Sequence, residues 1–283
     1  MEVRYERPQR LEAALAALAR APYRVLAGGT DLYPAHVTGP LPAALLDVSA
    51  LAEMRGVAAA GDGLRIGALT TWSEIARAEL PAHCAALAQA AREVGGVQIQ
   101  NRGTIGGNLC NASPAADGVP PLLALDARVE LASANGARTL PLAQFVLGNR
   151  RTACRPDELL VAVHVPVRSP RARSLFLKLG ARRYLVISIA MVDVVLDFDA
   201  AERVSYCGVA VGACAAAAQR LPALESGMLG AARADVPALA AALLSQPAAL
   251  APLSPIDDVR GTREYRLRAV RALLGRALTE LSA

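Results

Sequence analysis

The fold and function of this chain are decided by two short stretches, Val25-Leu26-Ala27-Gly28-Gly29-Thr30-Asp31 and Thr104-Ile105-Gly106-Gly107-Asn108. Each stretch places a Gly-Gly pair close to a threonine. Because glycine has no Cβ, backbone N–H groups in such a stretch approach a ligand closely. N–H groups that converge on one concavity bind anions such as phosphate. The two stretches together predict a ligand with two phosphates, or one diphosphate held from both sides, and two ordinary tight turns are the alternative.

The second stretch lies inside a long segment of mostly small and polar residues, 101–117. This segment lies between a helix-like run over 82–94 and an apolar run over 119–125. A loop of this length without secondary structure of its own is usually functional. The segment therefore predicts a functional loop. Neither stretch belongs to a G-x-G-x-x-G motif after a strand or to a G-x-x-x-x-G-K-[ST] motif, so the sequence supports neither a Rossmann site nor a P-loop.

Composition excludes several classes of protein. The chain has 283 residues, enough for two domains. It contains no charge-free apolar run of the length that spans a membrane, and its first residues lack the apolar core of a signal peptide. We therefore expect no membrane span and a cytoplasmic location. The net charge is +5, but the arginines are scattered and aromatic residues make up only 4%, so no nucleic-acid partner is expected.

The cysteines and histidines do not predict a metal site. The five cysteines are Cys84, Cys110, Cys154, Cys207 and Cys214, and no C-x-x-C occurs among them. Zinc and iron–sulfur sites usually use such closely spaced ligands. We expect Cys110 to be a small buried apolar residue, with a place near the ligand as the alternative. No catalytic constellation of Ser, His, Asp or Cys is supported by the spacing.

Lys178 is the only lysine among the 30 basic residues. A lysine kept in so arginine-rich a chain suggests that a compact ammonium is needed where a planar guanidinium would not serve. The alternative is that this lysine is present by chance.

Hydrophobic periodicity and turn signals predict an α+β chain in three units. Residues 1–56 form a small α/β unit with a helix over 11–20 and strands over 24–27 and 44–48. Residues 57–170 form a larger α+β unit, with hairpins over 57–69 and 128–140, a capped helix beginning at Thr71 and a strand over 159–165. Residues 171–283 follow a proline-containing linker over 166–173. They contain strands over 174–179, 186–198 and 204–211, then helices over 236–244 and 262–281.

Several features in this order resemble the FAD-binding (medium) subunit of the molybdenum hydroxylases, of the xanthine dehydrogenase and carbon monoxide dehydrogenase type. They are the two glycine stretches, the Asn-Ala-Ser-Pro-Ala-Ala-Asp run over 111–117, Asp157-Glu158-Leu159-Leu160 and Phe176-Leu177-Lys178-Leu179. The resemblance extends from about Tyr5 to the C-terminus. It implies a two-subdomain FAD-binding fold of the vanillyl-alcohol-oxidase (PCMH) type, followed by a C-terminal antiparallel sheet-and-helix domain.

The resemblance also implies the cofactor and the residues that bind it. FAD is expected to be non-covalent, because no convincing attachment residue is present; His36 is only a faint candidate. Asp117, Leu160 and Lys178 match positions that contact FAD in the family. The alternative role is a helix N-cap for Asp117 and a plain core position in a strand for Leu160, and for Lys178 the alternative is chance. The expected FAD-binding residues are Val25, Leu26, Ala27, Gly28, Gly29, Thr30, Asp31, Leu32, Thr104, Ile105, Gly106, Gly107, Asn108, Asp117, Leu160 and Lys178.

The resemblance further implies that the chain works as one subunit of a complex. A large molybdopterin subunit would act on the substrate, and a small [2Fe-2S] subunit would pass electrons to FAD and on to an external acceptor. The stretch over 182–187 departs from relatives, and Tyr184 and Ile187 are candidates to cover the flavin ring. A stand-alone flavin oxidoreductase of the same fold is the main alternative, and a scaffold without flavin is another.

Overall fold

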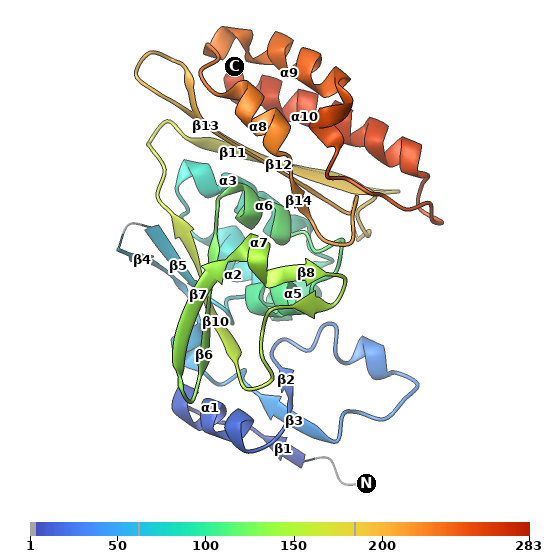
Figure 1. The fold of residues 1–283 in the computed structure, drawn as a ribbon. Coiled ribbons are helices and arrows are strands. Elements are labelled where there is room, and N and C mark those ends of the chain that lie inside the picture. Colours follow the sequence, from blue (N-terminus) through green and yellow to red (C-terminus); the bar gives the residue numbers. More distant parts are fainter. Residues whose placement is uncertain (1–3, 62, 184) are drawn as a thin grey trace.

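The computed structural model describes residues 4–61, 63–183 and 185–283 (Figure 1). Its α+β architecture has a small N-terminal unit at the bottom of Figure 1, a larger unit in the middle and a sheet covered by helices at the top. Each unit is built on its own sheet. The three main sheets are formed by successive segments of the chain, except that β10 returns to the centre of the middle sheet.

The N-terminal unit is a parallel sheet with one packed helix. Its strands are β1 (Arg4–Glu6), β2 (Arg24–Leu26) and β3 (Ala44–Asp47), in the order β1-β3-β2. Helix α1 (Leu11–Arg20) buries a stripe of apolar residues, which is the face its periodicity predicts. The first glycine stretch leaves the end of β2. It is thus placed at the carboxyl edge of a parallel sheet, where ligands commonly bind in α/β units.

The middle unit is a five-stranded antiparallel sheet with short helices beside it. Its strands, in the order β4-β5-β10-β6-β7, are β4 (Val57–Ala60), β5 (Gly63–Gly67), β10 (Leu159–Pro166), β6 (Arg128–Ser133) and β7 (Gly136–Pro141). The helices are α2 (Trp72–Arg77), α3 (Ala85–Glu93), α4 (Val97–Arg102), α5 (Ile105–Asn111), α6 (Val119–Ala124) and α7 (Leu142–Phe145), and a small ribbon pairs β8 (Val146–Gly148) with β9 (Arg151–Thr152).

The C-terminal unit is an antiparallel sheet buried on both faces. Its strands, in the order β11-β12-β13-β14, are β11 (Arg173–Leu179), β12 (Ala190–Phe198), β13 (Val204–Gly212) and β14 (Gln219–Arg220). Helices α8 (Pro222–Met228), α9 (Val236–Ser245) and α10 (Arg263–Ser282) cover one face, and α3 and α6 of the middle unit lie under the other (Figure 1). Alternate residues of β12 accordingly join different apolar clusters: Val194 packs toward the C-terminal helices, and Val195 packs into the core of the middle unit.

An ionic cluster joins the middle and C-terminal units. Asp126, just after α6, accepts hydrogen bonds from Arg168 (2.6 Å), Arg220 (2.6 Å) and the hydroxyl of Tyr206 (2.7 Å). The guanidinium of Arg168 also lies 3.5 Å from the centre of the Tyr206 ring, a cation–π contact. The cluster fixes the C-terminal sheet against α6, and so fixes what that sheet contributes to the site described below.

Most long elements agree with the sequence predictions. The helix over 11–20, both hairpins and the strand at 159–166 are present, and Thr71 forms the expected capping box with Glu74. The tip residue Asp62 of the first hairpin lies outside the described residues. The prediction of a loop over 101–117 is wrong, because α5 and the end of α4 lie in it. The strand expected from residue 186 begins only at Ala190.

Candidate functional site

A cleft of about 510 Å³ lies where the two glycine stretches come together. Its volume is in the range of small-molecule and cofactor sites. The first stretch forms one wall and the second stretch, with the run that ends at Asp117, forms another. The loop over 152–158 and Leu159-Leu160 close the remaining side. Segments more than 70 residues apart in sequence thus line one cavity, as expected if both stretches serve one ligand.

Direct backbone contact holds the two walls together. A Cβ at Gly28 would lie 1.9 Å from the carbonyl oxygen of Arg102 and 3.2 Å from Cα of Gly103, just before the second stretch. A side chain therefore cannot be accommodated unless one backbone moves away. Gly29 adopts φ 77°, in the left-handed region that glycine enters at little cost. The glycine pair is thus required for packing and for chain direction before any ligand is considered.

The first stretch has unused hydrogen-bond donors. Within the described chain, none of the backbone N–H groups from Gly28 to Leu32 donates a hydrogen bond to another residue. The carbonyls of Gly29 and Asp31 accept from the N–H groups of Tyr33 (3.1 Å) and Ala35 (3.2 Å), so the chain turns helically here. The first N–H groups of a helical turn have no partner within the turn. They form a row of donors suited to an anion.

The second stretch is different, because it begins helix α5. Thr104 is the N-cap, and its Oγ1 accepts from the N–H of Gly107 (3.1 Å). The N–H of Ile105 donates to Thr70 O (3.0 Å) and that of Gly106 to Ala68 O (2.8 Å). The donors predicted for this stretch are therefore paired within the protein, since a helix start and two neighbouring carbonyls use them. The stretch offers the cleft its Cβ-free surface and the Asn108 side chain.

Asn108, a residue of the cleft wall, has a buried acceptor without a partner in the described part of the chain. Its Oδ1 is buried and has no hydrogen-bond partner among the described residues. Asn108 lines the cleft, and a buried polar atom without a protein partner calls for one from elsewhere. The row of unpaired donors over 28–32 on the opposite wall fits a ligand that carries an anionic group.

Asp117 is a buried acidic residue of the cleft. Its side chain is 9% exposed and lines the cleft. Oδ2 accepts from Lys178 Nζ (2.8 Å) and Oδ1 accepts from Ser188 Oγ (2.9 Å). Burial raises the pKa of the Asp117 carboxyl above its usual value, and the Lys178 ammonium opposes that rise. The N-cap alternative for Asp117 is wrong, because Gly118 is the N-cap of α6 and no side chain caps that helix.

Lys178 lies behind Asp117, one layer away from the cleft. Its Nζ also donates to Glu93 O (3.1 Å), and its side chain is only 6% exposed. It lines a second cavity of about 520 Å³, between β11 and α3. The structure thus gives Lys178 a direct contact with Asp117, and the ammonium acts on the cleft through that carboxylate.

The remaining expected residues divide into those on the cleft and those away from it. Leu160 lines the cleft, while Ile105 is fully buried and does not. Ile187 is 54% exposed and lies outside the cleft lining, and Tyr184 is outside the described residues. The prediction that Cys110 is buried is wrong: it is exposed on the cleft wall, on the side of α5 that faces the cavity.

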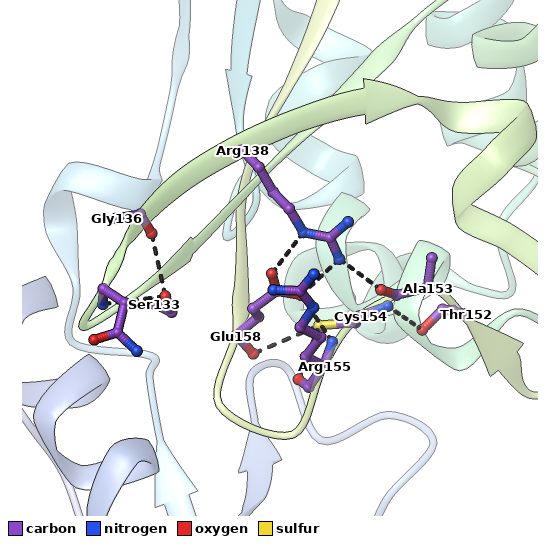
Figure 2. A network of polar contacts seen from close by, with 9 residues as sticks. Ser133, Gly136, Arg138, Thr152, Ala153, Cys154, Arg155 and Glu158 are labelled. Carbon is purple, nitrogen blue, oxygen red and sulfur yellow. Dashed lines mark hydrogen bonds and ion pairs between the residues drawn. The ribbon is translucent and has the colours of Figure 1, made fainter.

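One ionic network was missed from the sequence. Glu158 accepts from Arg138 Nε (2.6 Å) and Nη2 (2.9 Å), and from the backbone N–H of Arg155 (2.8 Å) (Figure 2). Arg138 Nη2 also donates to Ala153 O (2.8 Å). The Arg138 guanidinium lowers the pKa of the Glu158 carboxyl, so the pair stays charged. The network holds the loop over 152–158 as a cleft wall, and no spacing in the sequence connects Arg138 to Glu158.

Both parts of the chain match known protein families. Residues 1–168 match the family described as "FAD binding domain in molybdopterin dehydrogenase", and residues 176–281 match "CO dehydrogenase flavoprotein C-terminal domain". The gap between the two matches covers the end of the linker and the first residues of β11. In the described residues, no helix is both long enough and apolar enough to cross a membrane.

Individual relatives match either part of the chain or nearly all of it. The xanthine dehydrogenase FAD-binding subunit of Escherichia coli O157:H7 is 40% identical over 170 residues, a match that spans 57% of this chain and 57% of that relative. The nicotine 6-hydroxylase medium subunit of Paenarthrobacter nicotinovorans is 31% identical over 99% of this chain and 98% of its own length. A solved carbon monoxide dehydrogenase from Hydrogenophaga pseudoflava superposes with a TM-score of 0.88 at 30% identity, covering 98% of this chain and 96% of that chain.

Proposed function

Because the chain belongs to the family of FAD-binding medium subunits of the xanthine and carbon monoxide dehydrogenase type, we propose that its cleft holds one FAD without a covalent bond. The observation that carries this proposal is the row of unpaired N–H donors over 28–32, which lines the same cavity as Asp117. The N–H row suits the diphosphate, and the Asp117 carboxylate suits hydroxyl groups.

The residues of the cleft bind and orient, and FAD supplies the redox chemistry when it is bound. Gly28 and Gly29 let the backbone approach the ligand. Asp117, held by Lys178 and Ser188, keeps a charged acceptor at a nearly dry position, where hydrogen bonds to a charged group are strong. Leu160 gives an apolar contact on the third wall. No acid–base group in this set is placed to transform an organic substrate.

The chain therefore serves electron transfer within a larger complex. Electrons would reach it from a small [2Fe-2S] subunit, after a large molybdopterin subunit has oxidised the substrate, and would leave to an external acceptor such as NAD⁺ or a quinone. The names of the full-length relatives, a medium subunit of nicotine 6-hydroxylase and a medium chain of carbon monoxide dehydrogenase, support this division of work. The residues that cover the flavin ring and the cytoplasmic location stay predictions.

Two measurements test the proposal. The purified chain should show a flavin absorption spectrum with about one FAD per chain, and acid precipitation should release the flavin into the supernatant. Colour that stays with the pellet would contradict non-covalent binding. If the chain neither holds FAD after purification nor takes it up when FAD is supplied, the result would favour the alternative that the chain is a scaffold without flavin.

A second experiment separates the subunit from the stand-alone oxidoreductase. A chemical reductant should reduce the bound flavin, whereas aromatic and heteroaromatic substrates should not. Addition of the molybdopterin and [2Fe-2S] subunits should make flavin reduction depend on substrate. Turnover of such a substrate by the isolated chain would favour the stand-alone enzyme.

A further inference from the structure

We propose that Ser188 is a positioning residue of the flavin site: its hydroxyl holds Asp117 so that the carboxylate presents its free acceptor positions to the hydroxyl groups of the ligand. The inference rests on the proposed function, because it assigns a role at the same site. Nothing in the sequence motifs singles out Ser188, which lies after the stretch over 182–187 and just before β12.

The carboxylate of Asp117 is held at both oxygens from the C-terminal unit. Lys178 Nζ donates to Oδ2 (2.8 Å) and Ser188 Oγ donates to Oδ1 (2.9 Å). An ionised carboxylate has about four acceptor positions, so two donors fix its plane and leave the others free. Because Asp117 lines the cleft, a ligand hydroxyl in the cleft would meet a carboxylate whose orientation is already set.

Ser188 is itself held in place. Its side chain is buried, with a relative exposure of 2%. The next residue, Ile189, donates its N–H to Leu179 O (2.8 Å), beside Lys178 on β11. The carbonyl of Ile189 accepts from the buried Arg266 of α10 (2.6 Å). These bonds keep Ser188 next to Lys178, so the C-terminal unit delivers both donors to Asp117 as one rigid piece.

The hydroxyl also helps to keep Asp117 ionised. Burial raises the pKa of this carboxyl and Glu93 at the end of α3 raises it further, while Lys178 and the Ser188 hydrogen bond lower it. Loss of the Ser188 hydroxyl would let the pKa rise further. A protonated Asp117 loses its charge-assisted hydrogen bonds to ligand hydroxyls. As the pH is lowered, FAD affinity should therefore begin to fall at a higher pH in a variant without this hydroxyl than in the parent.

The test compares Ser188→Ala with Ser174→Ala. Ser174 on β11 is also buried and also bonds across the two units, because its Oγ accepts from the N–H of Ala86 (2.9 Å), but it is not on the cleft. FAD is titrated into flavin-depleted full-length protein at a series of pH values. We expect Ser188→Ala to weaken FAD binding about tenfold and to move the pH profile of affinity upward. Ser174→Ala should leave both unchanged.

An isosteric pair covers the outcome in which Ser188→Ala does not fold. Ser188→Thr keeps the hydroxyl, whereas Ser188→Val places a side chain of the same size as threonine but without the hydroxyl. Only the threonine variant should therefore keep the parent's pH profile. Equal affinity and equal pH profiles for Ser188→Ala and Ser174→Ala would overturn the role of Ser188, as would equal profiles for the threonine and valine variants. A parent chain that binds no FAD at any pH would overturn the proposed function, and the role of Ser188 with it.

Discussion

The two glycine pairs line one cleft, but they differ in what their backbone is free to do. After Leu26 the chain leaves a strand, and the N–H groups over 28–32 have no partner in the described chain. At Thr104 the chain starts a helix, and the N–H groups over 105–107 all donate to protein oxygens. A Gly-Gly pair therefore leaves N–H donors available for an anion only where the following residues do not use them.

The order of residues explains this difference. In the second stretch Thr104 precedes the glycine pair by two positions, so its hydroxyl reaches the N–H of Gly107 as an N-cap. In the first stretch Thr30 follows the pair, and no hydroxyl stands at the capping position. The same residue types therefore give a capped helix in one place and an open turn in the other.

The largest expected effect comes from Gly28→Val. Its Cβ would collide with the backbone carbonyl of Arg102 at 1.9 Å, and backbone cannot move aside cheaply. We expect a loss of about 3 kcal/mol in the free energy of unfolding, measured by chemical denaturation, together with loss of FAD binding. Gly39→Val is the matched control, because nothing lies within 4 Å of a Cβ there. Equal stability of the two variants would show that the two walls do not touch in solution.

Hydrogen exchange sharpens the comparison without any mutation. In flavin-free protein the N–H groups over 28–31 should exchange rapidly, and FAD at about 100 times its Kd should slow them by about 100-fold. The N–H groups over 105–108 are already hydrogen-bonded. They should be protected before FAD is added and should change much less. Protection of both stretches only when FAD is present would mean that the second is also open in the free protein.

These expectations show what the sequence was able to predict. The helix over 11–20 and the hairpins follow from local periodicity and turn residues, which need no knowledge of distant contacts. Asp117 was expected at the site from its position in a run that resembles the family, and it lines the cleft. Where periodicity was missing, as in the small and polar residues of 101–117, the predicted loop is a helix held by Thr70 and Ala68 from another segment.

The residues that were missed act through partners far away in sequence. Ser188 is 71 positions from Asp117, and Glu158 is 20 from Arg138. A serine or a glutamate in a sequence carries no mark of which carboxylate or guanidinium it will meet. Lys178 was expected at the flavin because it is the only lysine and because it matches a position that contacts FAD in the family that the chain resembles. The structure places Asp117 between Lys178 and the cleft. Which layer a side chain occupies is decided by how the sheets pack.

A smaller effect is expected for Thr104→Ala, which removes the cap of α5. Loss of an N-cap hydroxyl costs about 1 kcal/mol, and it frees the N–H of Gly107 beside the cleft. Thr262→Ala is the control, since Thr262 caps α10 by accepting from Tyr265 N–H (3.2 Å) and does not line the cleft. Both variants should lose similar stability in thermal unfolding, and only Thr104→Ala should change FAD affinity. A change in FAD affinity of the same size in Thr262→Ala would mean that the effect comes from lost stability.

The smallest change in stability is expected for Gly107→Ala, and it tests the wall that the second stretch provides. Gly107 is not among the glycines with positive φ, and its Cβ would meet only Thr104 Oγ1, at 2.9 Å. Alanine stabilises a helix relative to glycine by up to about 1 kcal/mol. This gain offsets the close contact with the N-cap residue Thr104, so the free energy of unfolding should change by less than about 0.5 kcal/mol. The added methyl group stands beside the cleft and should weaken FAD binding several-fold. Gly106→Ala is the contrasting variant. Its Cβ would lie 2.7 Å from Cβ of Ala68, so this variant should lower the free energy of unfolding more than Gly107→Ala does. If Gly107→Ala binds FAD as tightly as the parent, the ligand does not contact this wall, and the first stretch alone would account for the binding of the diphosphate.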